Sequence, residues 1–160
     1  MPCREDALAA MVALFNVQRV ISEAIERDLR SKTGLSLAQY EVLLRLADAP
    51  GGKLRMVDIS ERICVSKSGV TQLVDRLEEV GLVARESSRS DRRLTYAKIT
   101  REGRETLRRS QPKLGSAVQE NFARYLSDPE MGWLHEALRK VLEGHGVPSE
   151  ATDAPARKSP

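Results

Sequence analysis

Side chains that can form hydrogen bonds with another molecule lie on one side of the segment from Ser66 to Leu77. At helical spacing, this segment places its apolar residues on one face and its hydroxyl, amide and basic residues on the other. The apolar residues are Val70, Leu73, Val74 and Leu77. The polar residues are Lys67, Ser68, Thr71, Gln72 and Arg76. The pattern predicts a helix that packs through one face and can form hydrogen bonds with a ligand through the other.

A second stretch whose side chains could bind another molecule is rich in arginine and lies between two short extended runs. Its charged residues are Arg85, Glu86, Arg89, Asp91, Arg92 and Arg93. Residues 82–84 begin one predicted strand and residues 94–99 alternate as the returning strand, so residues 87–91 form the polar tip of a hairpin. Guanidinium groups at such a tip suit the narrow, electronegative minor groove of DNA, although charged tips are also often only solvated.

The elements before the polar helix complete a helix-turn-helix arrangement. A short helix is predicted over residues 56–63. Its inward side chains are Val57, Ile59 and Ile63. A turn at residues 64 and 65 leads to Ser66, a suitable N-cap, and Gly81 can adopt the left-handed backbone that ends the next helix. The second helix of such a pair enters the major groove of DNA. Because helical hairpins without DNA ligands are common, it is the adjacent arginine-rich hairpin that favours DNA.

Further helices are predicted on both sides of this segment. Apolar spacing places them over residues 7–29, 36–47, from Thr100 to about 126, and 128–144. Pro112 lies inside the third of these and predicts a bend just before it. The residues after Gly146 include three prolines and few apolar side chains, which predicts disorder. The predicted fold class is mainly α with a small β-hairpin wing.

The first helix has a broader apolar face than a surface helix needs. Its apolar residues are Leu8, Met11, Val12, Leu14, Phe15, Val17, Val20, Ile21, Ala24 and Ile25. Burial on two sides, against the chain's own core and against a second subunit, explains this width. A central core helix within one chain is the alternative.

Size, charge and cysteine content limit the class of protein. A length of 160 residues, 41% of them hydrophobic, allows one compact domain with extensions. The net charge of +3 permits a nucleic-acid partner but does not argue for one by itself. The apolar run at residues 7–15 follows an acidic lead and is too short to span a bilayer, so we expect neither a signal peptide nor a membrane partner. The two cysteines, Cys3 and Cys64, predict free thiols in the cytoplasm.

Residue patterns for catalysis, metals and cofactors are lacking. The sequence has no glycine-rich phosphate loop and no nucleophile elbow. His135 and His145 lie ten residues apart without a ligand cluster around them. We therefore expect a protein that is not an enzyme and needs no metal or cofactor. A thiol enzyme based on a cysteine is the least implausible catalytic alternative.

Several of these motifs resemble the winged-helix regulators of the MarR type, named for multiple antibiotic resistance. The resemblance extends from about Leu8 to Leu142. Its most specific pieces are VSKSGVTQLVDRLE at 65–78, GLV at 81–83, SDRR at 90–93 and KITREG at 98–103. It implies a homodimer with intertwined terminal helices and two winged lobes on a pseudo-palindromic operator in double-stranded DNA. The segments it implies are an N-terminal dimerisation helix (1–34), a winged helix-turn-helix domain (35–100), C-terminal dimerisation helices (101–145) and a disordered tail (146–160).

Carried over position by position, the resemblance implies two groups of DNA contacts. Those in or beside the major groove are Ser66, Lys67, Ser68, Thr71, Gln72 and Arg76. Those on the wing are Arg89, Asp91, Arg92 and Arg93. Asp91 and Arg93 look like the family's wing pair, in which the carboxylate orients an arginine that enters the minor groove. Gln72 can pair with adenine, and the hydroxyl groups can bind phosphates.

The resemblance also implies regulation by a small molecule. The family usually senses small, often aromatic or phenolic ligands in a cleft between the dimerisation helices and the winged lobe, and the ligand releases a repressor from DNA. The residues of such a cleft here would be Phe15, Arg19, Tyr40 and Leu44, although apolar and aromatic residues at helical spacing also form plain core.

Two alternatives to this scheme stay open. Oxidation of Cys64, next to the recognition helix, could release DNA, whereas a small buried hydrophobe is the simpler role for this cysteine. A winged-helix module could also use its wing arginines to bind an acidic protein partner in place of DNA.

Overall fold

The computed structural model describes residues 3–63, 66–87 and 94–147 and divides the chain into two compact units, which meet between Asn121 and Phe122. The helices of the first unit are α1 (Arg4–Thr33), α2 (Leu37–Asp48), α3 (Met56–Arg62), α4 (Lys67–Glu79) and α5 (Arg101–Asn121), with a 3-10 turn η1 (Pro50–Gly52). Its strands are β1 (Lys53–Arg55), β2 (Val83–Ser87) and β3 (Thr95–Ile99). The second unit contains η2 (Ala123–Tyr125) and α6 (Asp128–Gly144). The mainly α fold class predicted from the sequence is confirmed.

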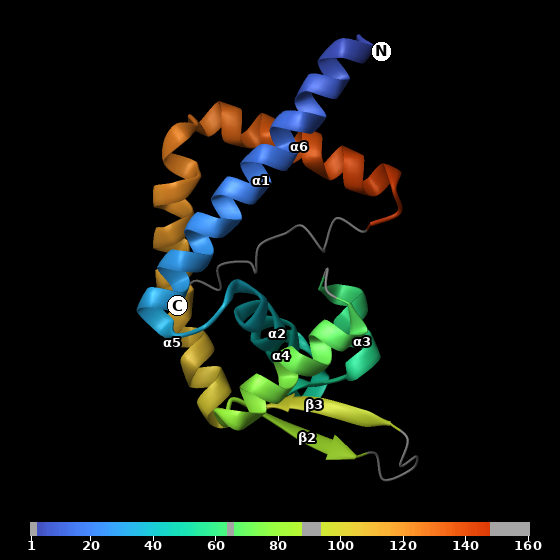
Figure 1. Cartoon of the computed structure of the whole chain (residues 1–160), viewed down its shortest axis with the longest axis vertical. Helices are drawn as coiled ribbons and strands as arrows, with labels where there is room; N and C mark the ends of the chain where they lie inside the picture. Colours follow the sequence, from blue (N-terminus) through green and yellow to red (C-terminus); the bar gives the residue numbers. More distant parts are fainter. Residues whose placement is uncertain (1–2, 64–65, 88–93, 148–160) are drawn as a thin grey trace. The chain divides into compact units, whose positions relative to one another are not determined.

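The sheet has three antiparallel strands in the order β1-β3-β2. Val83 lies opposite Ile99 and Ser87 opposite Thr95, so β2 and β3 form the predicted hairpin arm (Figure 1). The strand β1 was not predicted, because three residues are too few to show an alternating pattern. Leu54 of β1 lies opposite Ala97 of β3, and both side chains are buried in the core. The base of the wing is therefore joined to the chain that leads into α3.

One hydrophobic core lies beneath α2, α3, α4 and the sheet. Its fully buried side chains include Leu29, Val42, Leu43, Leu46, Ile59, Val70, Val74, Leu77 and Ala97. The inward position predicted for Val57 is wrong, because this side chain is 37% exposed. Val57 and Ile59 are two residues apart and point about 200° apart around a helix, so they cannot both face the core. Ile59 and Ile63, four residues apart, are both buried.

Two glycines allow the wing and α5 to follow α4. Gly81 has a φ of 74°, the left-handed backbone that was predicted to end α4. The Thr100 hydroxyl donates to the Gly81 carbonyl at 2.8 Å and accepts from the Gly103 amide at 3.0 Å, so it caps α5 as predicted. A Cβ on Gly103 would overlap the carbonyl oxygen of Leu82. The first turn of α5 can therefore lie directly against the start of β2 only because residue 103 is glycine.

The long helices lie where the sequence pattern predicted them, with differences at their ends. The helix α1 extends from Arg4 to Thr33, beyond the predicted residues 7–29 on both sides. The helix α5 runs in one piece through Pro112, so the proline does not split it. In the second unit, Ser127 and Glu130 form a capping box at the start of α6, whose Trp133 and Val141 are exposed. The predicted disordered tail lies, after residue 147, outside the described residues.

Candidate nucleic-acid interface

The helix α4 divides cleanly into a buried apolar face and an exposed polar face. Val70, Val74 and Leu77 are at most 1% exposed, and Leu73 packs against the same core. The exposed residues on the other side are Ser66, Ser68, Thr71, Gln72 and Arg76. The division predicted from spacing is confirmed, and α4 presents hydroxyl, amide and guanidinium groups on a helix whose orientation is held by the core beneath it.

The start of α4 is ordered by its own serines. The Ser66 hydroxyl accepts a hydrogen bond from the Gly69 amide at 3.2 Å and lies 3.1 Å from the Ser68 hydroxyl. This is the N-cap predicted for Ser66. Because helix amides and short hydroxyls meet at this exposed end, it suits an anion such as a backbone phosphate.

Arg85 ties the wing to the recognition helix. Its side chain comes from β2 and lies 2.5 Å from the Asp75 carboxylate and 2.6 Å from the Glu78 carboxylate, both on α4. The Arg85 backbone amide also donates to Glu78 at 3.1 Å. Partial burial lowers the pKa of the Arg85 guanidinium, but its hydrogen bonds to Asp75 and Glu78 outweigh burial and raise that pKa above its ordinary value. We call these three residues the wing clamp.

The wing clamp changes the interpretation of the arginine-rich hairpin. Sequence reasoning grouped Arg85 with the arginines of the hairpin tip, but its donors are used inside the fold. The acids Asp75 and Glu78 stand three residues apart on one side of α4, and Arg85 follows Gly81 by four residues. That spacing was the signal in the sequence for a contact of Arg85 with these two acids, since the strand that follows the end of the helix runs back along it.

A second set of ion pairs lies at the base of the wing. Glu86 of β2 lies 2.8 Å from the Lys98 ammonium and 3.7 Å from that of Lys53. The Lys98 hydrogen bond is the main cause of the lowered pKa of Glu86. The Lys53 ammonium also lies 5.4 Å from the centre of the Tyr96 ring. These contacts link all three strands, so the wing leaves the fold from a fixed base.

Several predicted site residues lie outside the part of the chain that the structure describes. These are Cys64, Arg89, Asp91, Arg92 and Arg93, and nothing is described of the Lys67 side chain. Their predicted roles stay predictions. Within the described ranges, no group of three or more histidine, cysteine, aspartate or glutamate residues could hold a metal ion.

The residues expected to bind a small ligand fall into two different surroundings. Tyr40 is buried in the core, and Leu44 packs against that core. Burial, followed by the charge of Asp48, raises the pKa of the Tyr40 phenol. Phe15 is 63% exposed on α1, and Arg19 on the same helix pairs with Glu23 at 3.5 Å. The described chain thus leaves Phe15 and Arg19 outside the core that contains Tyr40.

Sequence comparison identifies the family to which this architecture belongs. The model of the MarR family matches residues 33–94, which contain the helix-turn-helix and the first strand of the wing, β2. The transcriptional regulator HosA of Escherichia coli O127:H6 is 32% identical over 108 residues, or 68% of this chain and 78% of that protein. The chain belongs to the MarR family of transcriptional regulators. The HTH-type transcriptional repressor MdtR of Bacillus subtilis is also 32% identical, over 79% of this chain and 77% of its own.

A solved structure of a MarR family regulator has a similar fold. The crystal structure of Sco3205, a MarR family regulator from Streptomyces coelicolor in complex with DNA, superposes with a TM-score of 0.79. The two sequences are 28% identical, and the similarity covers 90% of each chain. This MarR-family chain is therefore a transcriptional regulator with a DNA-binding winged helix, built from α3, α4, β2 and β3.

Proposed function

We propose that the chain acts as a homodimeric repressor, which binds a pseudo-palindromic operator and is released by a small ligand. The observation that carries the DNA-binding step is the exposed polar face of α4, fixed to the wing through Arg85. Gln72 would read a base in the major groove, and Ser66, Lys67, Ser68, Thr71 and Arg76 would bind beside it. The wing residues Arg89, Asp91, Arg92 and Arg93 would reach the minor groove.

The part of α1 before Ile21 supports the proposed dimer. Its seven exposed large apolar side chains are Leu8, Met11, Val12, Leu14, Phe15, Val17 and Val20. An apolar surface of this extent is typical of an interface between proteins. By length and composition alone, α1 could also cross a membrane. We favour a second copy of the chain in the cytoplasm, because the same helix ends in a DNA-binding lobe.

A ligand would act by binding more tightly to one of two arrangements of the lobes. A repressor binds its operator when the two recognition helices match successive major grooves, and a ligand that prefers another spacing weakens DNA binding by its differential affinity. An aromatic or phenolic compound would meet Arg19 and Phe15 on α1, together with Tyr40 and Leu44 on α2, if the partner subunit covered α1. The relative MdtR is a transcriptional repressor, which supports repression as the direction of control.

Selection of bound sequences from random duplexes tests this function. We expect a palindrome with half-sites about one helical turn apart, and an affinity that falls steeply with salt. Gln72→Ala should weaken discrimination at one base position, whereas Gln111→Ala, a matched exposed glutamine on α5, should leave it unchanged. Binding to an acidic protein with no affinity for duplex DNA at low salt would establish the competing interaction module instead.

Oligomeric state is measured separately. Sedimentation equilibrium without detergent should give twice the mass of the 160-residue chain. A monomer at micromolar concentration, or a protein recovered only with membranes, would refute the dimer.

A further inference from the structure

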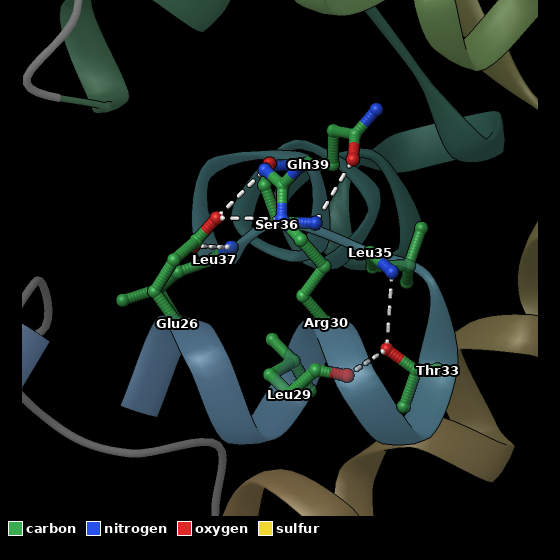
Figure 2. A network of polar contacts seen from close by, with 8 residues as sticks. All are labelled: Glu26, Leu29, Arg30, Thr33, Leu35, Ser36, Leu37 and Gln39. Atoms are coloured by element: carbon green, nitrogen blue, oxygen red, sulfur yellow. Dashed lines mark hydrogen bonds and ion pairs between the residues drawn. The ribbon is translucent and has the colours of Figure 1, made fainter. Parts of the chain in front are cut away.

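The turn between α1 and α2 is a short reversal in which consecutive backbone amides have acceptors. Thr33 ends α1 and Leu37 begins α2. The amides of residues 34–37 donate, in order, to the Arg30 carbonyl at 2.9 Å, the Thr33 hydroxyl at 3.2 Å, the Gln39 side chain at 2.9 Å and the Glu26 carboxylate at 2.6 Å. Figure 2 shows the bonds of the Leu35, Ser36 and Leu37 amides at this junction. A reversal whose donors are satisfied in this way is a stiff connection.

Glu26 differs from the other acceptors because it lies far from its donor in sequence. It stands eleven residues before Leu37, and its side chain crosses from α1 to the first amide of α2 (Figure 2). Its second oxygen accepts from the Arg30 guanidinium at 2.8 and 3.2 Å, which holds the carboxylate in place. A carboxylate is favoured at the positive end of a helix. The helix α2 therefore has two caps, which are Ser36, the residue directly before it, and Glu26 of α1.

The end of α1 is also anchored on another side. Asn121 of α5 donates to the Asp28 carboxylate at 2.8 Å, and Ile25 and Leu29 are buried. The part of α1 before Ile21 has only exposed side chains. One end of the helix is therefore fixed in the winged lobe. The other end has exposed apolar side chains, which we have proposed to pack against the second copy.

We propose that Glu26 is a positioning residue that sets the angle between α1 and the winged lobe, and through it the half-site spacing that the dimer accepts. This inference rests on the proposed dimeric DNA binding. A helix of 30 residues is about 45 Å long, so a rotation of about 5° at one end moves the other by about 4 Å. Successive base pairs rise by about 3.4 Å. A small change at the Glu26 contact thus displaces the lobes by about one base-pair step.

Operators of graded spacing test the role of Glu26. Palindromic duplexes with the same half-sites, separated by one or two base pairs more or fewer than the selected operator, are titrated with wild-type protein, Glu26→Ala and Glu23→Ala. Glu23 is the matched control, because it also pairs with an arginine four residues away but has an exposed side chain. We expect Glu26→Ala to lower the preference for the selected spacing about tenfold. Glu23→Ala should keep the wild-type preference.

A second variant removes the donor and leaves the carboxylate. Leu37→Pro deletes the amide that Glu26 accepts, and proline is tolerated at the first position of a helix. Ser36 already has the extended backbone, with φ of −73° and ψ of 160°, that a following proline requires. We expect Leu37→Pro to lower the preference for the selected spacing, as Glu26→Ala does. Circular dichroism confirms that each variant is folded, and Glu26→Gln, which keeps an acceptor oxygen, should give an intermediate preference.

The outcomes separate this inference from the function on which it rests. If Glu26→Ala binds every spacing more weakly by the same factor, the residue only stabilises the fold and the inference is wrong. Wild-type protein that binds no duplex overturns the proposed function, and the inference with it. A wild-type preference shared unchanged by Glu26→Ala and Leu37→Pro overturns the inference alone.

Discussion

The helices α1 and α4 are both rich in apolar residues, but most of the large apolar side chains of α1 are left exposed by the chain. Val70, Val74 and Leu77 of α4 are enclosed by the core, whereas the large apolar side chains of α1 from Leu8 to Val20 are all at least 45% exposed. The sequence pattern of each helix is similar, so amphipathicity alone does not tell which surface covers the apolar face. The contrast suggests that α4 determines the stability of the lobe and that α1 determines assembly.

The largest effect should come from the buried face of α4. Leu77→Ala removes a side chain that is 0% exposed, and we expect a loss of about 2–5 kcal/mol in the free energy of unfolding. Val80→Ala, at the exposed residue that follows α4, should change it by less than about 0.5 kcal/mol. Urea denaturation followed by circular dichroism measures both. Equal losses in the two variants would contradict the assignment of Leu77 to the buried core.

Next in size is the effect of a charge on the bare face of α1. Phe15→Glu should weaken the proposed dimer by about 3 kcal/mol, or roughly a hundredfold in Kd, because it buries an unpaired carboxylate in an apolar interface. Val57→Glu introduces the same charge at an exposed valine of α3 and should leave the dimer intact. Sedimentation velocity over a concentration series compares them. An unchanged dimer in Phe15→Glu would show that another surface holds the copies together.

A smaller effect is expected from the wing clamp. Arg85→Met keeps the aliphatic part of the side chain but loses the contacts with Asp75 and Glu78. We expect Kd for the operator to rise about tenfold, with a loss of stability near 1 kcal/mol, because the wing is no longer held against α4. Arg101→Met is the control, since Arg101 on α5 makes an exposed pair with Glu105. Unaltered operator binding by Arg85→Met would rule out a positioning role for the clamp.

The smallest effect concerns the acid sensitivity of the lobe. The Arg55 guanidinium, 2.6 and 2.8 Å away, holds the pKa of Asp58 below its ordinary value of 3.8. A carboxyl group whose pKa is lowered by folding stabilises the folded state above pH 3.8, and this contribution is lost as the pH falls through the folded value. Asp58→Asn should therefore show a shallower fall in thermal midpoint on acidification below about pH 4. A fall as steep as that of the wild type would assign the acid sensitivity to other groups.

Much of the helix-turn-helix could be predicted from the sequence because its signals are local. Spacing separated the two faces of α4, Ser66 marked its start, and Gly81 marked its end. Val57 was misplaced because a seven-residue helix gives too little periodicity to choose between neighbouring apolar positions. The ligand residues were chosen by resemblance alone, and the chain by itself leaves Phe15 exposed and Tyr40 in the core.

The order of polar, apolar and turn residues determined by itself which segments form helices, which residue caps α4, and which face of α4 stays in water, since these depend on residues within a few positions of each other. Only the tertiary structure decided the pairing of β1 with β3, the contact of Arg85 with Asp75 and Glu78, and the bond from Glu26 to the first amide of α2. Each of these joins residues from different elements, and a side chain finds such a partner only after the core has brought the elements together.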